Sequence, residues 1–185
     1  MSRPRSTKRD LERYAKLFAS RTREMKSSAM RDMMAITQRP DVISLAGGLP
    51  ETGSFPPQSF AAAAQRMAVQ ATLARALQYG PTEGLDEMKE CIVEAMAAED
   101  MRVDPAEMIV TTGGQQVIDL VTKTLIDPGD VIIAEAPTYP GAVPVFVSYQ
   151  ADVVQIEMDS AGMRVDLLEE TLGRLEREGR RPKFI

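Results

Sequence analysis

The 185-residue chain is 44% hydrophobic and 26% charged, which is an ordinary balance for a globular protein. Its apolar runs are all shorter than the roughly 20 residues that a membrane-spanning helix needs. The basic N-terminus is not followed by the apolar segment of a secretory signal. We therefore expect a cytoplasmic protein without membrane contact. The sequence has one cysteine, Cys91, and no histidine. These counts exclude an intrachain disulfide, histidine-based metal sites and serine–histidine catalysis within this chain.

The net charge of -5 is unevenly distributed along the sequence. Residues 1–31 carry ten basic and three acidic side chains, a net +7, which leaves -12 for the remainder. A basic arm can bind nucleic acid, but residues 11–34 also have the spacing of an amphipathic helix. We therefore predict a helical arm that packs on the body of the protein or on a partner subunit. The apolar positions on one side of this helix are Leu11, Tyr14, Leu17 and Phe18.

The next third of the chain is predicted to be helical, with two breaks rich in glycine and proline. Pro40 ends a short helix, and a Gly/Pro-rich loop follows a short β-like run. An alanine-rich stretch without Gly or Pro inside it predicts one long helix. The elements expected, in chain order, are a helix over 27–38, a β-like run over 42–45, a helix over 56–77, and a helix over 85–101 with Ile92, Val93 and Met96 on one side.

Beyond Asp104-Pro105 the pattern changes to apolar strands that alternate with helices. This alternation predicts an α/β fold whose mostly parallel sheet is covered by helices on both faces. Because the sequence stops as a strand opens, we expect it to be the N-terminal portion of a larger protein. The strands are expected at 108–112, 131–136, 152–158 and from 180 onward, and the helices at 115–126, 138–150 and 165–179.

Two segments place possible ligand-binding groups after predicted strands. In "TTGGQQ" the first-turn amides of Gly114, Gln115 and Gln116 would be unpaired donors that favour an anion, although a plain strand-to-helix turn would have the same appearance. In "EAPTYPG", Tyr139 follows the next strand. Ligands bind outside the carboxyl ends of parallel strands, so we expect Tyr139 on the same edge as Gly114. Its ring could stack on a planar cofactor or close the edge of the core.

Two loops in the first half of the chain have similar features. In "LQYGPTEGLDEM" the hydroxyl of Tyr79 could donate to a phosphate, and the alternative is a capped loop between helices. In "LAGGLPETGSFP" the backbone amides could meet a carboxylate, and the alternative is an ordinary loop. Neither loop is specific when taken alone.

Taken together, "SLAGGLP", "LQYGPTEGLDEMKE", "IVTTGGQQVIDLV" and "LIDPGDVIIAEAPTYPGA" resemble the fold type I, pyridoxal-phosphate-dependent aminotransferases, and most closely their 2-aminoadipate/kynurenine-type branch. The resemblance runs from about Tyr14 to the last residue. It implies a homodimer, a mobile N-terminal helix over the substrate pocket, and no role for nucleic acid. Residues 1–50 would be the arm and a small-domain segment, and residues 51–185 the first part of the cofactor-binding large domain.

The resemblance also implies roles for individual residues. Gly114 and Gln115 would bind the cofactor phosphate through their backbone amides, and Tyr139 would stack on the pyridine ring. Tyr79 would reach across the dimer to the cofactor phosphate of the partner. The loop containing Gly47 and Gly48 would lie near the substrate carboxylate.

The catalytic lysine of the family is not matched in this sequence. In the family it lies further along the chain, as do the residues that contact the ring nitrogen, the ring oxygen and the substrate carboxylate. We interpret Lys89, Lys123 and Lys183 as solvated surface charges that do not replace it. The prediction is an aminotransferase that moves an amino group between an amino acid and a 2-oxo acid when complete, and is inactive as this chain alone. The alternatives are another pyridoxal-phosphate reaction such as β-elimination, or a non-catalytic, cofactor-binding regulator.

Overall fold

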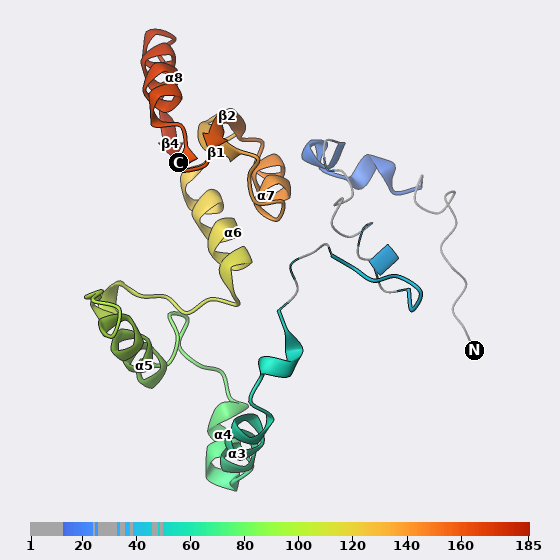
Figure 1. The fold of residues 1–185 in the computed structure, drawn as a ribbon, viewed down its shortest axis with the longest axis vertical. Coiled ribbons are helices and arrows are strands. Elements are labelled where there is room, and N and C mark those ends of the chain that lie inside the picture. Colours follow the sequence, from blue (N-terminus) through green and yellow to red (C-terminus); the bar gives the residue numbers. More distant parts are fainter. Residues whose placement is uncertain are drawn as a thin grey trace. The chain divides into compact units, whose positions relative to one another are not determined.

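The computed structural model describes residues 13–23, 25, 33, 36–37, 39–45, 48 and 50–185. The chain divides into two compact units. The first, here called the sheet unit, comprises Met1–Ile43 and Gly113–Ile185. The second, the helical unit, comprises Ser44–Thr112. The strands and helices of each unit can be followed in Figure 1, and each unit is described by itself.

The sheet unit contains a four-stranded sheet in the order β3-β2-β1-β4. Strand β1 is parallel to β2 and to β4, and β3 forms an antiparallel hairpin with the end of β2. The prediction of an α/β fold is thus confirmed, with a parallel sheet extended by one antiparallel strand. The strands are β1 Val131–Ala136, β2 Asp152–Asp159, β3 Gly162–Met163 and β4 Pro182–Phe184.

Helices cover both faces of this sheet. Ile132 of β1 points toward α6 and α7, where it packs with Ala142 and Phe146. Its neighbours Val131 and Ile133 point to the opposite face and pack with Leu175 of α8. Successive side chains of a strand alternate between faces, so a strand covered on both sides must be apolar throughout, as "VIIAEA" nearly is. The helices are α6 Gly114–Leu125, α7 Ala142–Ser148 and α8 Val165–Arg177.

The predicted strand at 108–112 is wrong. Residues 108–111 have no regular structure, and Ile109 is 55% exposed. The backbone N–H of Val110 donates instead to the carbonyl of Glu83 at 2.9 Å, within the helical unit. A strand exists only where a neighbouring strand accepts its hydrogen bonds, and this segment bonds to a loop.

The helical unit consists of α-helices and short 3₁₀ turns. The single helix predicted over 56–77 is two helices, because Val69 has an extended backbone (φ -64°, ψ 130°) and begins the second one. The alanine-rich composition gave no sign of this break, since intrinsic propensity is a weak guide to where helices of this length end. The elements are η3 Thr52–Ser54, α3 Pro57–Met67, α4 Gln70–Ala76, α5 Asp86–Ala97 and η4 Pro105–Glu107.

The N-terminal arm differs from the predicted amphipathic helix. Its described part forms two short 3₁₀ helices, η1 Ala15–Leu17 and η2 Ser20–Arg23, and η2 lies beside α7. Leu17 and Phe18 are 79% and 56% exposed, so the expected apolar stripe is not buried there. A short amphipathic helix needs tertiary packing to be stable, and this segment makes little. Leu11 and most of the predicted helix 27–38 lie outside the described residues.

The predicted β-like run at 42–45 is also absent. These four residues have no regular structure, and the backbone N–H of Val42 donates to the carbonyl of Arg39 in a turn. Leu45 is almost fully exposed, so the apolar side chains of the run are not drawn together into a core here. Among the residues that the structure describes, no helix is both long and apolar enough to cross a membrane.

Candidate cofactor-binding site

Helix α6 begins at a glycine N-cap, which makes no side-chain cap hydrogen bond. Its N-cap, Gly113, has φ 79° and ψ 173°, a backbone conformation that is essentially restricted to glycine, and it provides no side-chain cap. A Cβ built on Gly113 or on Gly114 would meet nothing within 4 Å, so the side of each residue where a side chain would stand is open. The amides of Gly114 and Gln115 belong to the first turn, where an α-helix offers its N–H groups no internal acceptor. Together with the helix dipole they favour an anion.

The expectation of three donors at this turn is corrected for one residue. The backbone N–H of Gln116 donates to the carbonyl of Gly113 at 3.1 Å, which closes a tight 3₁₀-type turn. That bond leaves the backbone amides of Gly114 and Gln115 as the two candidate donors of the first turn. The first turns of α-helices often tighten in this way, which the sequence alone does not reveal.

The loop after β1 brings Tyr139 to the same edge. This loop runs from the end of β1 to the start of α7, and the N–H of Ala142 donates to the carbonyl of Tyr139 at 3.0 Å. The side-chain amide of Gln115 donates to the carbonyl of Gly141 at 2.8 Å. The prediction that Tyr139 and the start of α6 share an edge is therefore confirmed. The ring of Tyr139 is 59% exposed, so it does not close the edge of the core.

Gly141 is a residue of this site that the sequence analysis missed. A Cβ at this position would lie 2.5 Å from Cε1 of Tyr139 and 2.6 Å from Oε1 of Gln115, far inside normal contact. A side chain at this position would therefore displace the Gln115 amide and the Tyr139 ring from their places against the loop. The "PG" dipeptide in the sequence indicates a turn but not this close approach.

A second contact joins the two helices behind the site. The hydroxyl of Tyr149, at the end of α7, donates to Oδ1 of Asp119 on α6 at 3.2 Å. Burial raises the pKa of the Tyr149 phenol, and the hydrogen bond to Asp119 raises it further because both favour the neutral form. The smaller, opposing effect comes from Arg21 of the N-terminal arm. This bond helps to fix the relative position of the two helices that supply the site.

Tyr79 and the glycine-rich loop belong to the helical unit. The loop that carries Tyr79 is anchored at its far end, where a Cβ on Gly84 (φ 102°) would lie 2.5 Å from Cγ2 of Val110. Tyr79 itself is 99% exposed, and its backbone N–H donates to the side chain of Gln78. Gly48 has φ 56°, in the left-handed region. Gly47 lies outside the described residues.

The three lysines considered as alternatives have different environments. Lys123 is exposed, as expected. The Nζ atom of Lys183 lies 3.3 Å from Oδ2 of Asp130, which precedes β1, so this lysine is at the amino edge of the sheet and away from Tyr139. Lys89 was expected to be a solvated charge and is instead only 8% exposed.

The burial of Lys89 follows from its place on α5. It precedes Ile92, Val93 and Met96 at helical spacing, so its aliphatic stem continues the partly buried side of that helix. Its Nζ atom lies 3.9 Å from Oδ1 of Asp86, one turn earlier. The prediction overlooked that a lysine can bury its stem and still keep its charged end paired.

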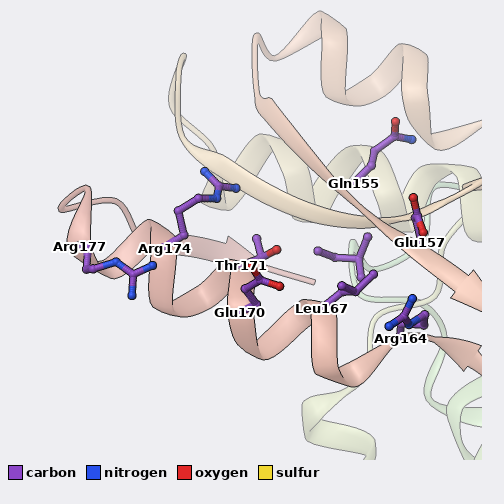
Figure 2. A pocket seen from close by; sticks show the side chains of 9 residues that line it. Gln155, Glu157, Arg164, Leu167, Glu170, Thr171, Arg174 and Arg177 are labelled. Atoms are coloured by element: carbon purple, nitrogen blue, oxygen red, sulfur yellow. The ribbon is translucent and has the colours of Figure 1, made fainter.

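Among the described residues, two of the cavities of the sheet unit bear on where the site lies. One, of about 390 Å³, is lined by apolar residues of β1 with Thr138, Phe146 and Phe184, near the carboxyl ends of β1 and β4. The other, of about 420 Å³, lies between β2 and α8 and is shown in Figure 2. It contains none of the predicted site residues, and two of its arginines, Arg164 and Arg174, are paired with Asp166 and Glu178. The first cavity adjoins the candidate site; the second is separate from it.

The chemistry of the site fits a ligand that has both a phosphate and a flat ring. Backbone amides at an uncapped helix start bind phosphate, with glycines that let the ligand approach closely. An exposed aromatic ring beside them can stack on a planar group. No cluster of acidic residues and cysteine that could hold a metal ion occurs among the described residues. The sheet edge is thus suited to an organic phosphate.

Comparison with known proteins supports the same assignment. The sequence profile of the family "Aminotransferase class I and II" matches residues 40–185. The chain is 39% identical to aromatic-amino-acid aminotransferase 1 of Thermococcus litoralis and 36% identical to 2-aminoadipate transaminase of Thermus thermophilus, with 93% of this chain and 41% of each relative covered. The crystal structure of kynurenine aminotransferase from Pyrococcus horikoshii in complex with PMP superposes with a TM-score of 0.82 at 32% identity, over 94% of this chain and 42% of that one.

The chain thus spans about 40% of the length of these relatives, and the match includes every predicted site segment from residue 40 onward. Its fold, its family profile and its relatives agree with one another. The chain belongs to the class I and II aminotransferase family.

Proposed function

We propose that this chain forms the phosphate- and ring-binding part of a pyridoxal 5'-phosphate-dependent aminotransferase. The complete enzyme, meaning this chain within a polypeptide of the relatives' length, moves an amino group between an amino acid and a 2-oxo acid. The observation that carries the proposal is the junction of the glycine-opened start of α6 with the Tyr139 loop through Gln115 and Gly141. Family membership and the names of the relatives support it, and they favour an aminotransferase over a β-lyase or a regulator.

Each group of the site has a distinct role in this proposal. The amides of Gly114 and Gln115 bind the cofactor phosphate, and the positive end of the α6 dipole strengthens that contact. The exposed ring of Tyr139 stacks on the pyridine ring and sets its plane. When bound, the cofactor supplies the electron sink for chemistry at the substrate Cα, while the protein orients it.

The helical unit contributes to the site through a dimer. Tyr79, exposed on an anchored loop, reaches the cofactor phosphate of a second subunit. Gly47 and Gly48 lie near the substrate carboxylate, and the left-handed backbone of Gly48 suits a loop whose amides face a ligand. Residues 1–50 belong to the arm and small domain, and residues 51–185 to the large domain. The enzyme acts in the cytoplasm.

The chain by itself binds the phosphate but does not transaminate. Lys89 is buried along a helix of the helical unit, Lys123 is exposed on α6, and Lys183 is paired at the opposite edge of the sheet from Tyr139. We therefore expect none of them to form the covalent bond with the cofactor.

The test is a transamination assay on the complete enzyme. An aromatic amino acid, 2-aminoadipate and kynurenine serve as amino donors, with 2-oxoglutarate as acceptor, because the relatives' names include these three donor types. We expect glutamate and the 2-oxo acid of at least one donor to form in equal amounts. Release of ammonia without glutamate would indicate an elimination reaction instead, and absence of both products would overturn the proposal.

A further inference from the structure

The start of α6 and the Tyr139 loop are joined by the side chain of Gln115, which the proposed phosphate contact does not involve. The phosphate requires only the backbone amide of Gln115. Its side chain turns to the neighbouring loop, where Nε2 donates to the carbonyl of Gly141 at 2.8 Å, across 26 positions of sequence. One residue therefore contacts both the phosphate-binding turn and the loop that carries the aromatic ring.

The contact is closely packed as well as hydrogen-bonded. The position of a Cβ on Gly141 would be 2.6 Å from Oε1 of Gln115 and 2.5 and 2.7 Å from Cε1 and Cζ of Tyr139. The amide of Gln115 and the ring of Tyr139 thus lie on the same side of Gly141, next to each other. The amide therefore borders one side of the ring, and its removal would leave that side of the ring without a neighbour.

The orientation of the amide is defined by its chemistry. With Nε2 donating to the Gly141 carbonyl, Oε1 is directed toward the α-carbon of the same residue. A glutamate at this position has the same shape but no donor, so it would place a carboxylate oxygen against a carbonyl oxygen. A methionine has similar length and flexibility and no hydrogen-bonding amide, and it is a good helix former.

The bond between Tyr149 and Asp119 makes the effect of this contact separable from helix packing. That bond joins α6 to the far end of α7, at 3.2 Å, and does not involve the loop. Loss of the Gln115 side-chain contact therefore leaves α7 attached to α6, while the loop between β1 and α7 loses a restraint. The change expected is local, at residues 137–141.

We infer that Gln115 is a positioning residue whose side-chain amide, bonded to the Gly141 carbonyl, holds the ring of Tyr139 at a fixed place relative to the phosphate-binding amides. The inference rests on the proposed function for the identity of the ligand. It adds to that function a coupling between the two anchor points of the cofactor. A ligand that has both a phosphate and a ring depends on this coupling, whereas a free phosphate does not.

The experiment compares Gln115→Met and Gln115→Glu with wild type in the complete enzyme. Gln65→Met is the matched control, since Gln65 is an exposed residue of α3. Two probes are titrated by calorimetry: pyridoxamine 5'-phosphate, which has the phosphate and the ring but forms no covalent bond with a lysine, and inorganic phosphate. We expect both Gln115 variants to raise the Kd of pyridoxamine 5'-phosphate about tenfold, which is about 1.4 kcal/mol, and that of inorganic phosphate by less than about twofold.

A double-mutant cycle with Tyr139→Ala tests whether the side chain acts through the ring. If it does, Gln115→Met weakens binding of pyridoxamine 5'-phosphate in wild type but adds little once Tyr139 is alanine. Fully additive losses, equal weakening of both probes, or no weakening at all would overturn the inference.

Hydrogen–deuterium exchange of the ligand-free enzyme separates this inference from the proposed function. Gln115→Met should speed exchange in peptides covering residues 137–142 and leave the rest of α7 unchanged, and Gln65→Met should change neither. Unchanged exchange at 137–142 would refute the role of the Gln115 side chain even if the cofactor binds. If exchange speeds up but wild type does not bind pyridoxamine 5'-phosphate, the side-chain contact is supported and the proposed cofactor is refuted.

Discussion

Gly113 and Gly114 are adjacent, but the first has a backbone conformation that favours glycine and the second does not. Gly113 has φ 79° and ψ 173°, in a region essentially closed to other residues, where a side chain costs of order 1–3 kcal/mol. Gly114 has no positive φ, and a Cβ built on it meets nothing within 4 Å. Replacing each by alanine therefore separates backbone strain from space needed by a ligand.

The expected outcomes are opposite for the two variants. Gly113→Ala should lower the stability of the complete enzyme, by about 1 M in the urea midpoint for a cost of about 2 kcal/mol and a slope of about 2 kcal/mol/M. Gly114→Ala should leave the midpoint within about 0.3 M. It should weaken binding of inorganic phosphate and of pyridoxamine 5'-phosphate about tenfold, because the proposed phosphate approaches the backbone at this residue and a methyl group there would keep it away.

Circular dichroism during urea unfolding and calorimetric titration give the two readings. A Gly113→Ala variant as stable as wild type would show that the turn does not need the glycine conformation. Unchanged phosphate binding by Gly114→Ala would mean that the ligand does not approach α6 at this turn, and the reasoning about the site would fail.

Three further outcomes are expected of the sheet unit. Leu175→Ala should destabilise the protein by about 2–5 kcal/mol in urea unfolding, because Leu175 is fully buried between α8 and the sheet. Leu172→Ala, at a partly exposed position of the same helix, should cost clearly less free energy of unfolding. Equal costs for the two variants would contradict the assigned core. Tyr149→Phe should cost about 0.5–1.5 kcal/mol through loss of its hydrogen bond to Asp119. The pKa of Tyr149 is raised in the folded state, so the stability that its hydroxyl contributes is complete below the ordinary tyrosine pKa near 10 and declines at higher pH. Above that pH, wild type should lose stability more steeply than Tyr149→Phe. Parallel profiles of stability against pH would contradict this role of the Tyr149 hydroxyl. Tyr139→Phe should bind pyridoxamine 5'-phosphate nearly as well as wild type, and Tyr139→Ala should weaken binding by about 0.5–1.5 kcal/mol, whereas equal losses would point to the hydroxyl and not to stacking.

The elements predicted best from the sequence are those whose spacing of apolar residues reflects which of their faces are buried. "VIIAEA" is apolar throughout because β1 is covered on both faces, and its predicted bounds agree with the structure. The helices α6 and α8 were also found within two residues, since each has one apolar side and clear ends. A helix that contacts the core along its whole length needs apolar residues at regular spacing, and this spacing is visible in the sequence.

Predictions failed where the outcome depends on a partner distant in sequence. Residues 108–112 have strand-like composition, but Val110 bonds to the loop at Glu83 and not to another strand. The break at Val69 inside an alanine-rich stretch is a tertiary feature that propensity does not encode. Lys89 has the charge of a surface residue, yet its spacing from Ile92 and Val93 places its stem on the buried side of α5.

The candidate site shows the same division. The placement of the α6 start and of Tyr139 at one edge could be predicted, because residues that follow parallel strands gather at the carboxyl edge of the sheet; their role toward a cofactor stays a prediction. The role of Gly141 and of the Gln115 side chain could not be predicted, because both depend on how closely two loops approach each other. Such approach distances exist only after the chain has folded.

The central claim is that the start of α6 and the Tyr139 loop together hold the cofactor, and a crystal structure of the complete enzyme with pyridoxamine 5'-phosphate tests it most directly. We predict phosphate oxygens within about 3 Å of the amide nitrogens of Gly114 and Gln115, a normal hydrogen-bond length, and the pyridine ring stacked on Tyr139. A phosphate bound elsewhere, with these two amides facing solvent, would contradict the account.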